Sequence, residues 1–502
     1  MKCEEEKTSY SGVKALIMGL GVNGGGLASA RYLASRGADL TVTDLRDEKA
    51  LAPSLEQLRD FQGIRYVLGR HETADFENAD MVVKNPGVRP DSPYLRKVRR
   101  VETDISLFLD YIDRAKTRLT VVTGSKGKSG TASAIHWVLQ KARERLLLGG
   151  SAFLGGNITV SPLTFLDAPC GCDSPDTPRP ADALQPGGDS PDDVVLELSS
   201  WQLGDLKGRI KAGSGGEALL KPRIATLTAI LPDHLDRYEN MEAYVADKRV
   251  IYQGQDARDV TVAYDDSWGR RFLSETHARK MACAERPLPD GIAGGWLSHD
   301  ASAPAFARLS PDAPVVEIVS AKNLVLGFHQ KKNLLAAGLS LLDLGLPASF
   351  IAENLSTFPG IEHRLEFFFE KDGVRFYNDT AATIPEAAAA AVDAFSENVV
   401  LLTGGADKQL DFTPLAKACA VAKKVVMLAG TGSVKLQTAL DAALIPYAGP
   451  YGDLNRAVAD CFAAAAPGDV VLLSPGCASF GMFQNEFDRG RKWKEAVRRF
   501  QS

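Results

Sequence analysis

One short stretch, Val121 to Thr131, constrains what this chain can fold into more than any other part of the sequence. The residues Arg118 to Val122 have the pattern of a short buried strand, and Ala132 to Lys141 have that of a helix. The glycines of the loop between them let backbone N–H groups surround an anion, next to the positive end of the helix. A strand, a glycine-rich loop and a helix in this order predict a phosphate-binding loop in an α/β domain.

The same loop contains the side chains that a nucleoside triphosphate needs. Lys128 can contact the terminal phosphates, and the Ser129 hydroxyl can coordinate Mg²⁺. The spacing is the short T-G-x-x-G-K-S, because position 122 is Val where the commoner motif has Gly. The alternative is a Gly-rich turn before an ordinary helix. We predict that ATP binds to Gly124, Ser125, Lys126, Gly127, Lys128, Ser129, Gly130 and Thr131.

Length and charge restrict the class of protein. A chain of 502 residues is too long for one core, and about three domains are expected. A net charge of −5 argues against nucleic acid or a membrane surface as the main partner. The start, Met1 to Tyr10, is charged and is not expected to be a signal peptide, and no apolar run reaches the ~20 residues of a membrane helix. The seven scattered cysteines indicate reduced thiols, so we expect a cytoplasmic protein. We also expect a monomer.

The N-terminal region has the pattern of a β-α-β unit. Gly19, Gly21 and Gly24 have the spacing G-x-G-x-x-G between two strands, and Asp44 follows about twenty residues later. This motif is typical of dinucleotide-binding folds, but any nucleotide diphosphate can use the same helix N-terminus. Residues 1–107 are therefore predicted to form a Rossmann-like domain. An NAD-dependent oxidoreductase is one reading, although it leaves the Lys128 loop unexplained.

Strands and helices continue to alternate along the rest of the chain, which predicts largely parallel sheets. The predicted buried strands include Met81 to Lys84, Ile224 to Leu227, Val399 to Thr403 and Val470 to Leu473, and one helix is expected around Met241 to Tyr252. We expect a central ATP-binding domain over residues 108–359 and a second Rossmann-like domain over residues 360–502. Two polar stretches, 167–193 and 207–217, have the composition of surface insertions, and 283–320 has no clear pattern. The role of these three segments is not evident from the sequence.

Two polar clusters follow strands of the predicted central domain. Glu197 ends one strand, where a carboxylate could hold the Mg²⁺ of a nucleotide; the alternative is an exposed strand-end acid. His234 lies in the run Leu231 to Arg237 and could be a metal ligand, but a lone His near Asp is often only a hydrogen-bonded loop residue.

The predicted C-terminal domain adds groups that suit anions. Arg364, Asp379 and Lys408 lie near strand ends, and each could equally belong to a turn, a cap or a surface ion pair. The segment Ser474 to Phe480 is expected to begin a helix with free N–H groups. Cys477 has no histidine partner in sequence and is not expected to be a nucleophile.

Taken together, these motifs resemble those of the Mur ligases across all three predicted domains. The resemblance rests on Thr123 to Ser129, Glu197 to Ser200, Asp233 to Arg237, Phe358 to Leu365 and Ser474 to Phe480. The run Glu197 to Gln202 and the Asn-Asp-Thr segment at 378–380 are most similar to members that add D-glutamate to UDP-N-acetylmuramoyl-L-alanine in peptidoglycan precursor synthesis. That activity implies an ATP-dependent ligase that forms an acyl phosphate.

The resemblance also implies roles for individual residues. Lys128 would bind the β- and γ-phosphates, Ser129 and Glu197 would serve a first Mg²⁺, and His234 a second. Lys248 matches a lysine that is carbamylated in the family, which would make it a carboxylate-like metal ligand. The other matches are ATP contacts (Asn333, Arg364, Asp379), the amino-acid pocket (Thr383, Lys408, Ser479, Phe480) and the UDP-sugar path (Val22, Asn23, Arg46, Asn85, Asn157).

The sequence departs from the family pattern at three places. Gln330 stands where Asn is usual, Ala381 stands where many members have Lys, and the order Asn-Glu-Phe at 485–487 is changed. The missing cation at position 381 leaves the stereochemistry of the added glutamate open. A sister Mur ligase, a folylpolyglutamate-type ligase and a non-catalytic UDP-sugar sensor are the alternatives.

Overall fold

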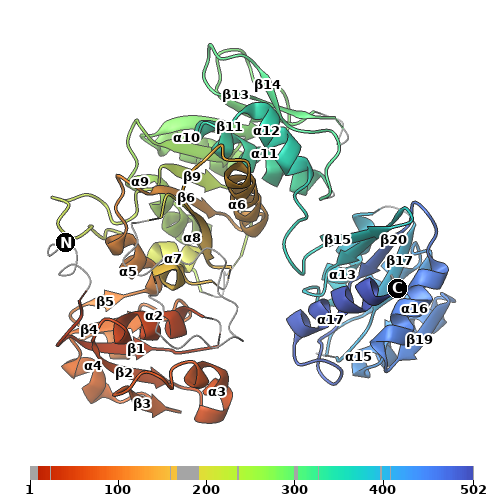
Figure 1. Cartoon of the computed structure of the whole chain (residues 1–502), viewed down its shortest axis with the longest axis horizontal. Helices are drawn as coiled ribbons and strands as arrows, with labels where there is room; N and C mark the ends of the chain where they lie inside the picture. Colours follow the sequence, from red (N-terminus) through yellow and green to blue (C-terminus); the bar gives the residue numbers. More distant parts are fainter. Residues whose placement is uncertain are drawn as a thin grey trace. The chain divides into compact units, whose positions relative to one another are not determined.

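The strands of this computed structural model form three sheets (Figure 1). The structure describes residues 9–22, 24–158, 160–166, 191–233, 237–298, 303–325, 327–395, 398–407 and 409–500. The chain divides into two compact units, Met1–Val319 with Lys332–Asn354, and Ser320–Lys331 with Leu355–Ser502. The first unit contains two sheets and the second contains one. No helix in the described ranges is long and apolar enough to cross a membrane.

The N-terminal sheet has five parallel strands in the order β3-β2-β1-β4-β5. Its elements are β1 (Lys14–Met18), α2 (Gly25–Ala34), β2 (Asp39–Asp44), α3 (Glu48–Glu56), β3 (Arg65–Leu68), α4 (Thr73–Asn78), β4 (Met81–Lys84), η1 (Pro93–Leu95), β5 (Val101–Glu102) and α5 (Asp104–Tyr111). Alternate side chains of β1 enter different cores. Ile17 packs with Leu27 of α2, whereas Leu16 packs with Phe76 of α4. The sheet is thus covered on both faces, as expected for a Rossmann-like domain.

The central sheet has nine strands in the order β14-β13-β12-β11-β10-β9-β6-β8-β7. The strands are β6 (Arg118–Thr123), β7 (Ala152–Gly156), β8 (Asp193–Glu197), β9 (Ile224–Leu227), β10 (Val260–Tyr264), β11 (Arg279–Ala284), β12 (Gly294–Trp296), β13 (Ala305–Arg308) and β14 (Val316–Val319). The helices are α6 (Lys128–Glu144), η2 (Pro162–Leu166), α7 (Ser200–Gly204), α8 (Met241–Lys248), α9 (Val250–Gln253), α10 (Ser267–Glu275), α11 (Phe328–Asp343) and α12 (Ala348–Ser356). Strands β6 to β12 are parallel, and β13 and β14 are antiparallel additions. The described part of the segment 283–320, which had no clear sequence pattern, contains β12 and the two antiparallel strands β13 and β14.

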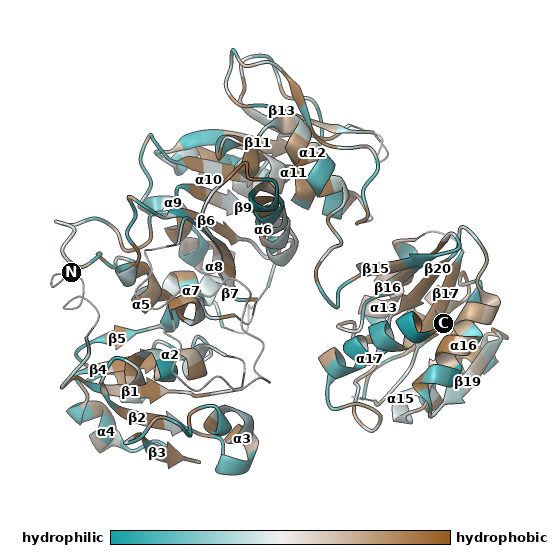
Figure 2. Ribbon diagram, in the orientation of Figure 1, coloured by the Kyte–Doolittle hydropathy of each residue, from teal (hydrophilic) through white to brown (hydrophobic). Residues whose placement is uncertain are grey.

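The C-terminal sheet has six strands in the order β15-β16-β20-β17-β18-β19. Its elements are β15 (Glu366–Lys371), β16 (Val374–Asn378), α13 (Pro385–Asp393), β17 (Val399–Thr403), α14 (Thr413–Cys419), β18 (Lys424–Leu428), α15 (Thr431–Ala442), β19 (Tyr447–Tyr451), α16 (Leu454–Ala464), β20 (Val470–Leu473) and α17 (Glu486–Arg499). Only β15 and β16 pair antiparallel among these strands. Helices α13 to α15 supply one core and α16 and α17 the other. The apolar strands between them are brown in Figure 2.

The architecture confirms the predicted three-domain α/β fold, while the limits 1–107, 108–359 and 360–502 stay a prediction. One predicted insertion, 207–217, is attached by hydrogen bonds to the end of α5 in the same unit. Lys211 donates to the carbonyls of Leu109, Asp110 and Ile112, which end or follow α5. The other insertion falls mostly on residues 167–190, which lie outside the described ranges.

A buried ion pair joins the N-terminal and central sheets of the first unit. Lys84 Nζ, at the end of β4, lies 2.6 Å from Asp205 Oδ2, which follows α7, and both side chains are at most 5% exposed. Nearby, Ser161 donates to Asp104 Oδ2 at 2.7 Å. Breaking one partner of a buried pair leaves an uncompensated charge, so these contacts fix how the two sheets meet.

Candidate active site

The predicted phosphate loop connects β6 to α6. Helix α6 begins at Lys128, four residues earlier than the sequence pattern indicated, with Gly127 as its N-cap at φ 89°. The backbone N–H groups of Ser125 and Lys126 donate to the Ala229 carbonyl. The N–H groups in the first turn of a helix have no partner inside the helix. The loop therefore presents the amides that start at Lys128 to an anion, with the helix dipole behind them.

Two loop glycines are required by close packing. Gly124 has φ 151°, and a Cβ atom there would lie 2.0 Å from Thr228 Oγ1. A Cβ atom on Gly127 would lie 2.4 Å from Asn333 Oδ1. Asn333 comes from α11, and its Oδ1 also accepts a hydrogen bond from the Tyr264 hydroxyl at 2.8 Å. The structure thus brings the predicted ATP residue Asn333 directly against the loop.

The Ser125 hydroxyl forms hydrogen bonds within the protein. Its hydroxyl donates to the Leu231 carbonyl at 2.8 Å and lies 2.9 Å from the Tyr244 hydroxyl. The Leu231 N–H donates back to the same hydroxyl at 3.0 Å. We infer that the Ser125 side chain shapes the loop and that α8, through Tyr244, supports it.

Two lysines converge on one carbonyl of the loop. Lys128 Nζ donates to Gly124 O at 3.1 Å, and Lys248 Nζ donates to the same oxygen at 2.8 Å. Lys248, the last residue of α8, is only 1% exposed and lies over the Tyr244 ring. Burial, and then the neighbouring Lys128 charge, lowers the pKa of the Lys248 amine to about 7. Near neutral pH a large fraction of this amine is therefore uncharged and can act as a nucleophile.

Glu197 ends β8, the strand that pairs with β6, and its register partner Val122 comes just before the loop. It is 1% exposed, which excludes the reading of an exposed strand-end acid. Its Oε1 accepts a hydrogen bond from Asn157 Nδ2 at 2.9 Å. Its Oε2 is buried and has no hydrogen-bond partner among the described residues. A buried carboxylate oxygen without a donor fits a divalent cation, for which carboxylates and hydroxyls such as Ser129 are ordinary ligands.

The glycine-rich turn after β1 is braced by an acid. Asp44 Oδ2 accepts from the Gly21 N–H, and Asp44 Oδ1 from the Arg46 N–H, both at 2.9 Å. Asn85 is half-buried after β4 and lies beside Gly19 and Gly21. Val22, Arg46 and Asn85 therefore follow three neighbouring strands at one edge of the sheet, and Val22 and Arg46 are exposed there. Asn157, predicted for the same path, follows β7 of the central sheet instead.

In the second unit, Asp379 follows β16 and is buried. The Ser474 hydroxyl donates to its Oδ2 at 2.6 Å, and the Leu365 N–H donates to its Oδ1 at 3.1 Å. Burial outweighs these hydrogen bonds and raises the pKa of the Asp379 carboxyl to about 6. Arg364, which precedes Leu365, is exposed, and the Leu365–Asp379 hydrogen bond joins the turn that carries Arg364 to the end of β16.

The predicted helix at Ser474 to Phe480 is absent, and this prediction was wrong. The N–H and C=O groups of Ala478 pair with those of Ala406, and α17 begins only at Glu486. Backbone groups used in this bridge cannot also start a helix. Of the predicted amino-acid pocket, Ser479 is buried, Thr383 is half-buried and Phe480 is 66% exposed.

Arg489 of α17 was missed by the sequence reasoning. It is 1% exposed, and its guanidinium donates to Thr380 Oγ1, Thr380 O and Cys477 O. It thereby ties the loop after β16 to the loop after β20. No local pattern distinguishes it from the other arginines of α17. Burial raises the pKa of the Cys477 thiol to about 12, so Cys477 is a thiol and not a nucleophile, as expected.

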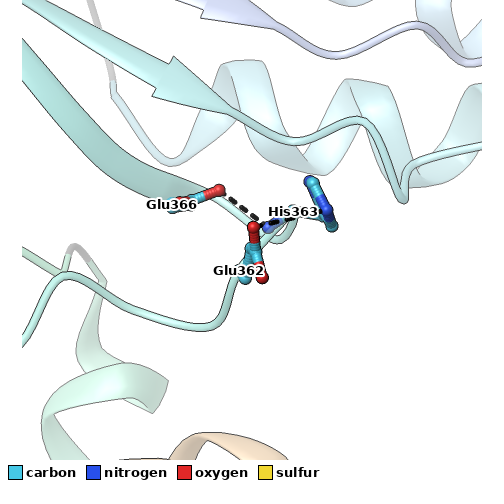
Figure 3. Close-up of side chains that lie close together, drawn as sticks. All are labelled: Glu362, His363 and Glu366. Carbon is cyan, nitrogen blue, oxygen red and sulfur yellow. Dashed lines mark hydrogen bonds and ion pairs between the residues drawn. The ribbon is translucent and has the colours of Figure 1, made fainter. Parts of the chain in front are cut away.

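Glu362, His363 and Glu366 lie close together before and at the start of β15 (Figure 3). Their ligand atoms all lie within 4.8 Å of one another, which is close enough for a metal ion. However, Lys494 Nζ already lies 2.8 Å from a carboxylate oxygen of each glutamate. An ammonium ion in that position neutralises the acids, so the cluster is an ion-pair network.

Three predicted site residues, Asn23, His234 and Lys408, lie outside the described residues. Their roles remain predictions.

By its fold and its loop, the molecule is a phosphate-loop nucleotide-binding protein of the α/β class. Family models match all three regions: "Mur ligase MurD-like, N-terminal domain" over residues 13–106, "Mur ligase middle domain" over 122–341, and "Mur ligase, glutamate ligase domain" over 363–477. The UDP-N-acetylmuramoylalanine–D-glutamate ligase of Treponema pallidum is 40% identical, with 99% of each chain covered. The enzyme of that name from Roseiflexus sp. is also 40% identical, with 98% of this chain and 99% of the relative covered. The chain belongs to the Mur ligase family.

Solved structures agree with the fold. UDP-N-acetylmuramate-alanine ligase MurC from Thermotoga maritima has a TM-score of 0.54 at 19% identity, covering 97% of this chain and 99% of that chain. MurF from Acinetobacter baumannii has a TM-score of 0.53 at 13% identity, covering 97% and 93%. At these identities the likeness concerns the fold alone.

Proposed function

We propose that this protein is an ATP-dependent ligase that joins D-glutamate to UDP-N-acetylmuramoyl-L-alanine in the cytoplasmic synthesis of peptidoglycan precursors. The observation that carries the proposal is that Lys128 and Lys248 both donate to the Gly124 carbonyl of the phosphate loop. Glu197 lies beside this loop, because it pairs in register with Val122 at the end of β6. The names of full-length relatives at 40% identity support the choice of substrates.

The reaction has two steps. The alanyl carboxylate of the UDP-sugar attacks the γ-phosphorus of ATP, the bond to the β–γ bridging oxygen breaks, and ADP leaves. The amine of glutamate then attacks the acyl carbon, loses a proton and expels phosphate. Both steps need charge neutralisation and positioning more than a protein nucleophile. Lys128 and the first-turn amides of α6 would stabilise the charge on the transferred phosphoryl group.

Magnesium ions, held by Ser129, Glu197, His234 and Lys248, would neutralise the phosphates and orient them. Two sites are expected. A cationic lysine cannot be a metal ligand, but the uncharged Lys248 amine can add to CO₂ and release a proton. The resulting carbamate carries a negative charge on oxygen. The low pKa of Lys248, caused mainly by burial, favours this chemistry.

The remaining assignments follow the family match. The ATP contacts would include Asn333, Arg364 and Asp379. The UDP-substrate would contact Val22, Asn23, Arg46, Asn85 and Asn157, and the amino acid would contact Thr383, Lys408, Ser479 and Phe480. The Asn157 amide bonds to Glu197, so we propose that it also orients that carboxylate. We expect a monomer.

Phosphate release tests this function. The purified protein is given ATP, Mg²⁺ and UDP-N-acetylmuramoyl-L-alanine with a panel of D- and L-amino acids. D-glutamate should give the fastest release, and every reaction should stop without the UDP-substrate. Preference for L-glutamate would show that Ala381 marks a changed pocket. Turnover with L-alanine, lysine or meso-diaminopimelate but not with glutamate would overturn the proposal.

A further inference from the structure

The turn that carries Arg364 has an unusual backbone. His363 on one side has φ 68° and Leu365 on the other has φ 45°. Both are non-glycine residues in the left-handed region, where the Cβ atom is crowded and the conformation costs free energy. Such a turn persists only where its surroundings hold it in place.

Hydrogen bonds to two carboxylates supply part of that support. The His363 N–H donates to Glu366 Oε2 at 2.9 Å, and the Leu365 N–H donates to Asp379 Oδ1 at 3.1 Å. The His363 carbonyl accepts from the Ala381 N–H at 3.0 Å. The backbone on both sides of Arg364 is therefore fixed by side chains and loops of the same unit.

Glu366 is itself held by residues from two other elements. Its Oε2 also accepts from Asn378 Nδ2 at 2.9 Å, and the same amide nitrogen lies 2.9 Å from His363 Nδ1. Its Oε1 accepts from Lys494 Nζ at 2.8 Å. Lys494 lies on α17, 128 residues further along the chain.

Lys494 acts on both ends of the turn. Its ammonium donates to Glu362 Oε1 and to Glu366 Oε1, each at 2.8 Å, and its side chain is only 14% exposed. Figure 3 shows that the two carboxylates approach each other beside the His363 ring. Without a cation between them, two carboxylates at this distance repel each other. Glu366 would then no longer be held where the His363 N–H needs it.

Helix α17 can approach the turn this closely because position 490 is glycine. A Cβ atom on Gly490 would lie 2.4 Å from His363 Nδ1. The His363 ring also packs against Phe487, with 5.4 Å between ring centroids. A side chain at position 490 would therefore push α17 away from His363 and from Thr380, whose Cγ2 would lie 2.6 Å from that Cβ atom.

We propose that Lys494, acting through Glu366, is a positioning residue that holds the turn 362–366 in the conformation that presents Arg364 to the triphosphate. Its effect on the reaction rests on the proposed function. Its effect on the turn does not.

A double-mutant cycle tests the kinetic part. Lys494→Ala should lower kcat/KM for ATP about tenfold, and Arg364→Ala about a hundredfold. If Lys494 acts only by positioning Arg364, the double variant should be no worse than Arg364→Ala alone. Lys494→Arg should keep most of the activity, because a guanidinium can also bridge the two carboxylates. The affinity for the UDP-substrate should not change.

The matched control is Lys492→Ala. Lys492 lies on the same helix and forms an ion pair with Asp488 at 2.9 Å. Its substitution therefore removes an ion pair from α17 and leaves the contacts of the turn in place. It should keep kcat/KM within about twofold of the wild type. Losses that multiply in the double variant, or a Lys494→Ala variant as active as Lys492→Ala, would overturn the proposal.

Hydrogen exchange gives a readout that does not depend on the reaction. In Lys494→Ala the amides of His363 and Leu365 should exchange at least tenfold faster, while those of β17 and β18 stay as protected as in the wild type. Glu366→Gln serves as a second variant, because it keeps an acceptor oxygen but loses the charge that Lys494 neutralises. Unchanged protection of the turn in both variants would contradict the proposal. A wild-type protein that releases no phosphate would instead refute the proposed function alone.

Discussion

Two glycine-rich turns of the first unit have the same backbone plan but different chemistry. Each follows a parallel strand and leads into a helix: Gly19 to Gly24 before α2, and Gly124 to Gly127 before α6. At the first turn, each oxygen of the Asp44 carboxylate accepts one backbone N–H, from Gly21 and from Arg46. In the second, Lys128 and Lys248 donate to the same carbonyl, and one Glu197 oxygen has no donor within the described ranges.

The difference separates binding from catalysis. The first turn is braced by the Asp44 carboxylate of β2, which accepts two backbone N–H groups, and a braced turn can hold a ligand without taking part in the chemistry. The second loop brings two lysine amines and a buried carboxylate together, and these are groups with which a phosphate and a divalent cation can interact. If this comparison is correct, variants in the second turn should change kcat, and variants in the first should change only substrate affinity.

The largest effect is expected for Lys128→Ala. Removing the charge that faces the transferred phosphoryl group should lower phosphate release by about 10³-fold. Binding of the UDP-substrate, measured by calorimetry, should remain. Lys141→Ala, on the last turn of the same helix, is the control and should be close to wild type. A Lys128→Ala variant with more than a tenth of the wild-type rate would contradict a catalytic role for the second turn.

Lys248→Ala should lower kcat by about 10²-fold, the size expected when a metal site loses a supporting group. Added acetate or formate should restore part of the rate, because a free carboxylate can replace the carbamate. Lys221→Ala, which breaks a partly buried ion pair with Asp256, should have neither the defect nor the rescue. An inactive Lys248→Ala that no carboxylate rescues would argue against a carbamate.

The same lysine should make the protein less stable. The pKa of Lys248 is near 7 in the folded chain and about 10.5 in the unfolded chain, so between these values the unfolded state binds the extra proton. Stability therefore rises with pH across this window. In bicarbonate-free buffer at pH 7, Lys248→Met should be more stable by a few kcal/mol. Urea unfolding at pH 7 and pH 9.5 measures this, and a variant equally or less stable at pH 7 would contradict it.

The smallest effect is expected in the first turn. Asp44→Asn puts an amide N–H₂ where a backbone N–H needs an acceptor, which should raise KM for the UDP-substrate about tenfold. The kcat value should change less than twofold. Asp39→Asn, at the exposed start of the same strand, is the control. A fall in kcat with unchanged KM would show that the N-terminal turn takes part in catalysis.

Sequence patterns located the short buried strands well. Met81–Lys84, Ile224–Leu227, Val399–Thr403 and Val470–Leu473 have the predicted bounds, because an apolar run flanked by polar or turn residues defines a buried strand locally. The helix predicted from Met241 to Tyr252 is two helices, which meet at Arg249. The helix expected after Ser474 failed because pairing with Ala406 decided the backbone there.

The residues of the candidate site also fall into those that a local sequence pattern predicts and those that it does not. Lys128, Ser129 and Glu197 were predicted from the loop motif and a strand end, since their neighbours in sequence carry the signal. The state of Lys248 could not be predicted, because its pKa depends on burial by residues far along the chain. Arg489 and Lys494 have no local signal either.

The sequence by itself determined the three α/β regions, the phosphate loop and the family, because these depend on periodicity and on short motifs. Only the tertiary structure decided which charges meet. The Lys84–Asp205 and Lys494–Glu366 pairs are separated by 121 and 128 residues. Charges this far apart in the chain interact only after folding has placed them within a few ångströms and excluded the water that would screen them.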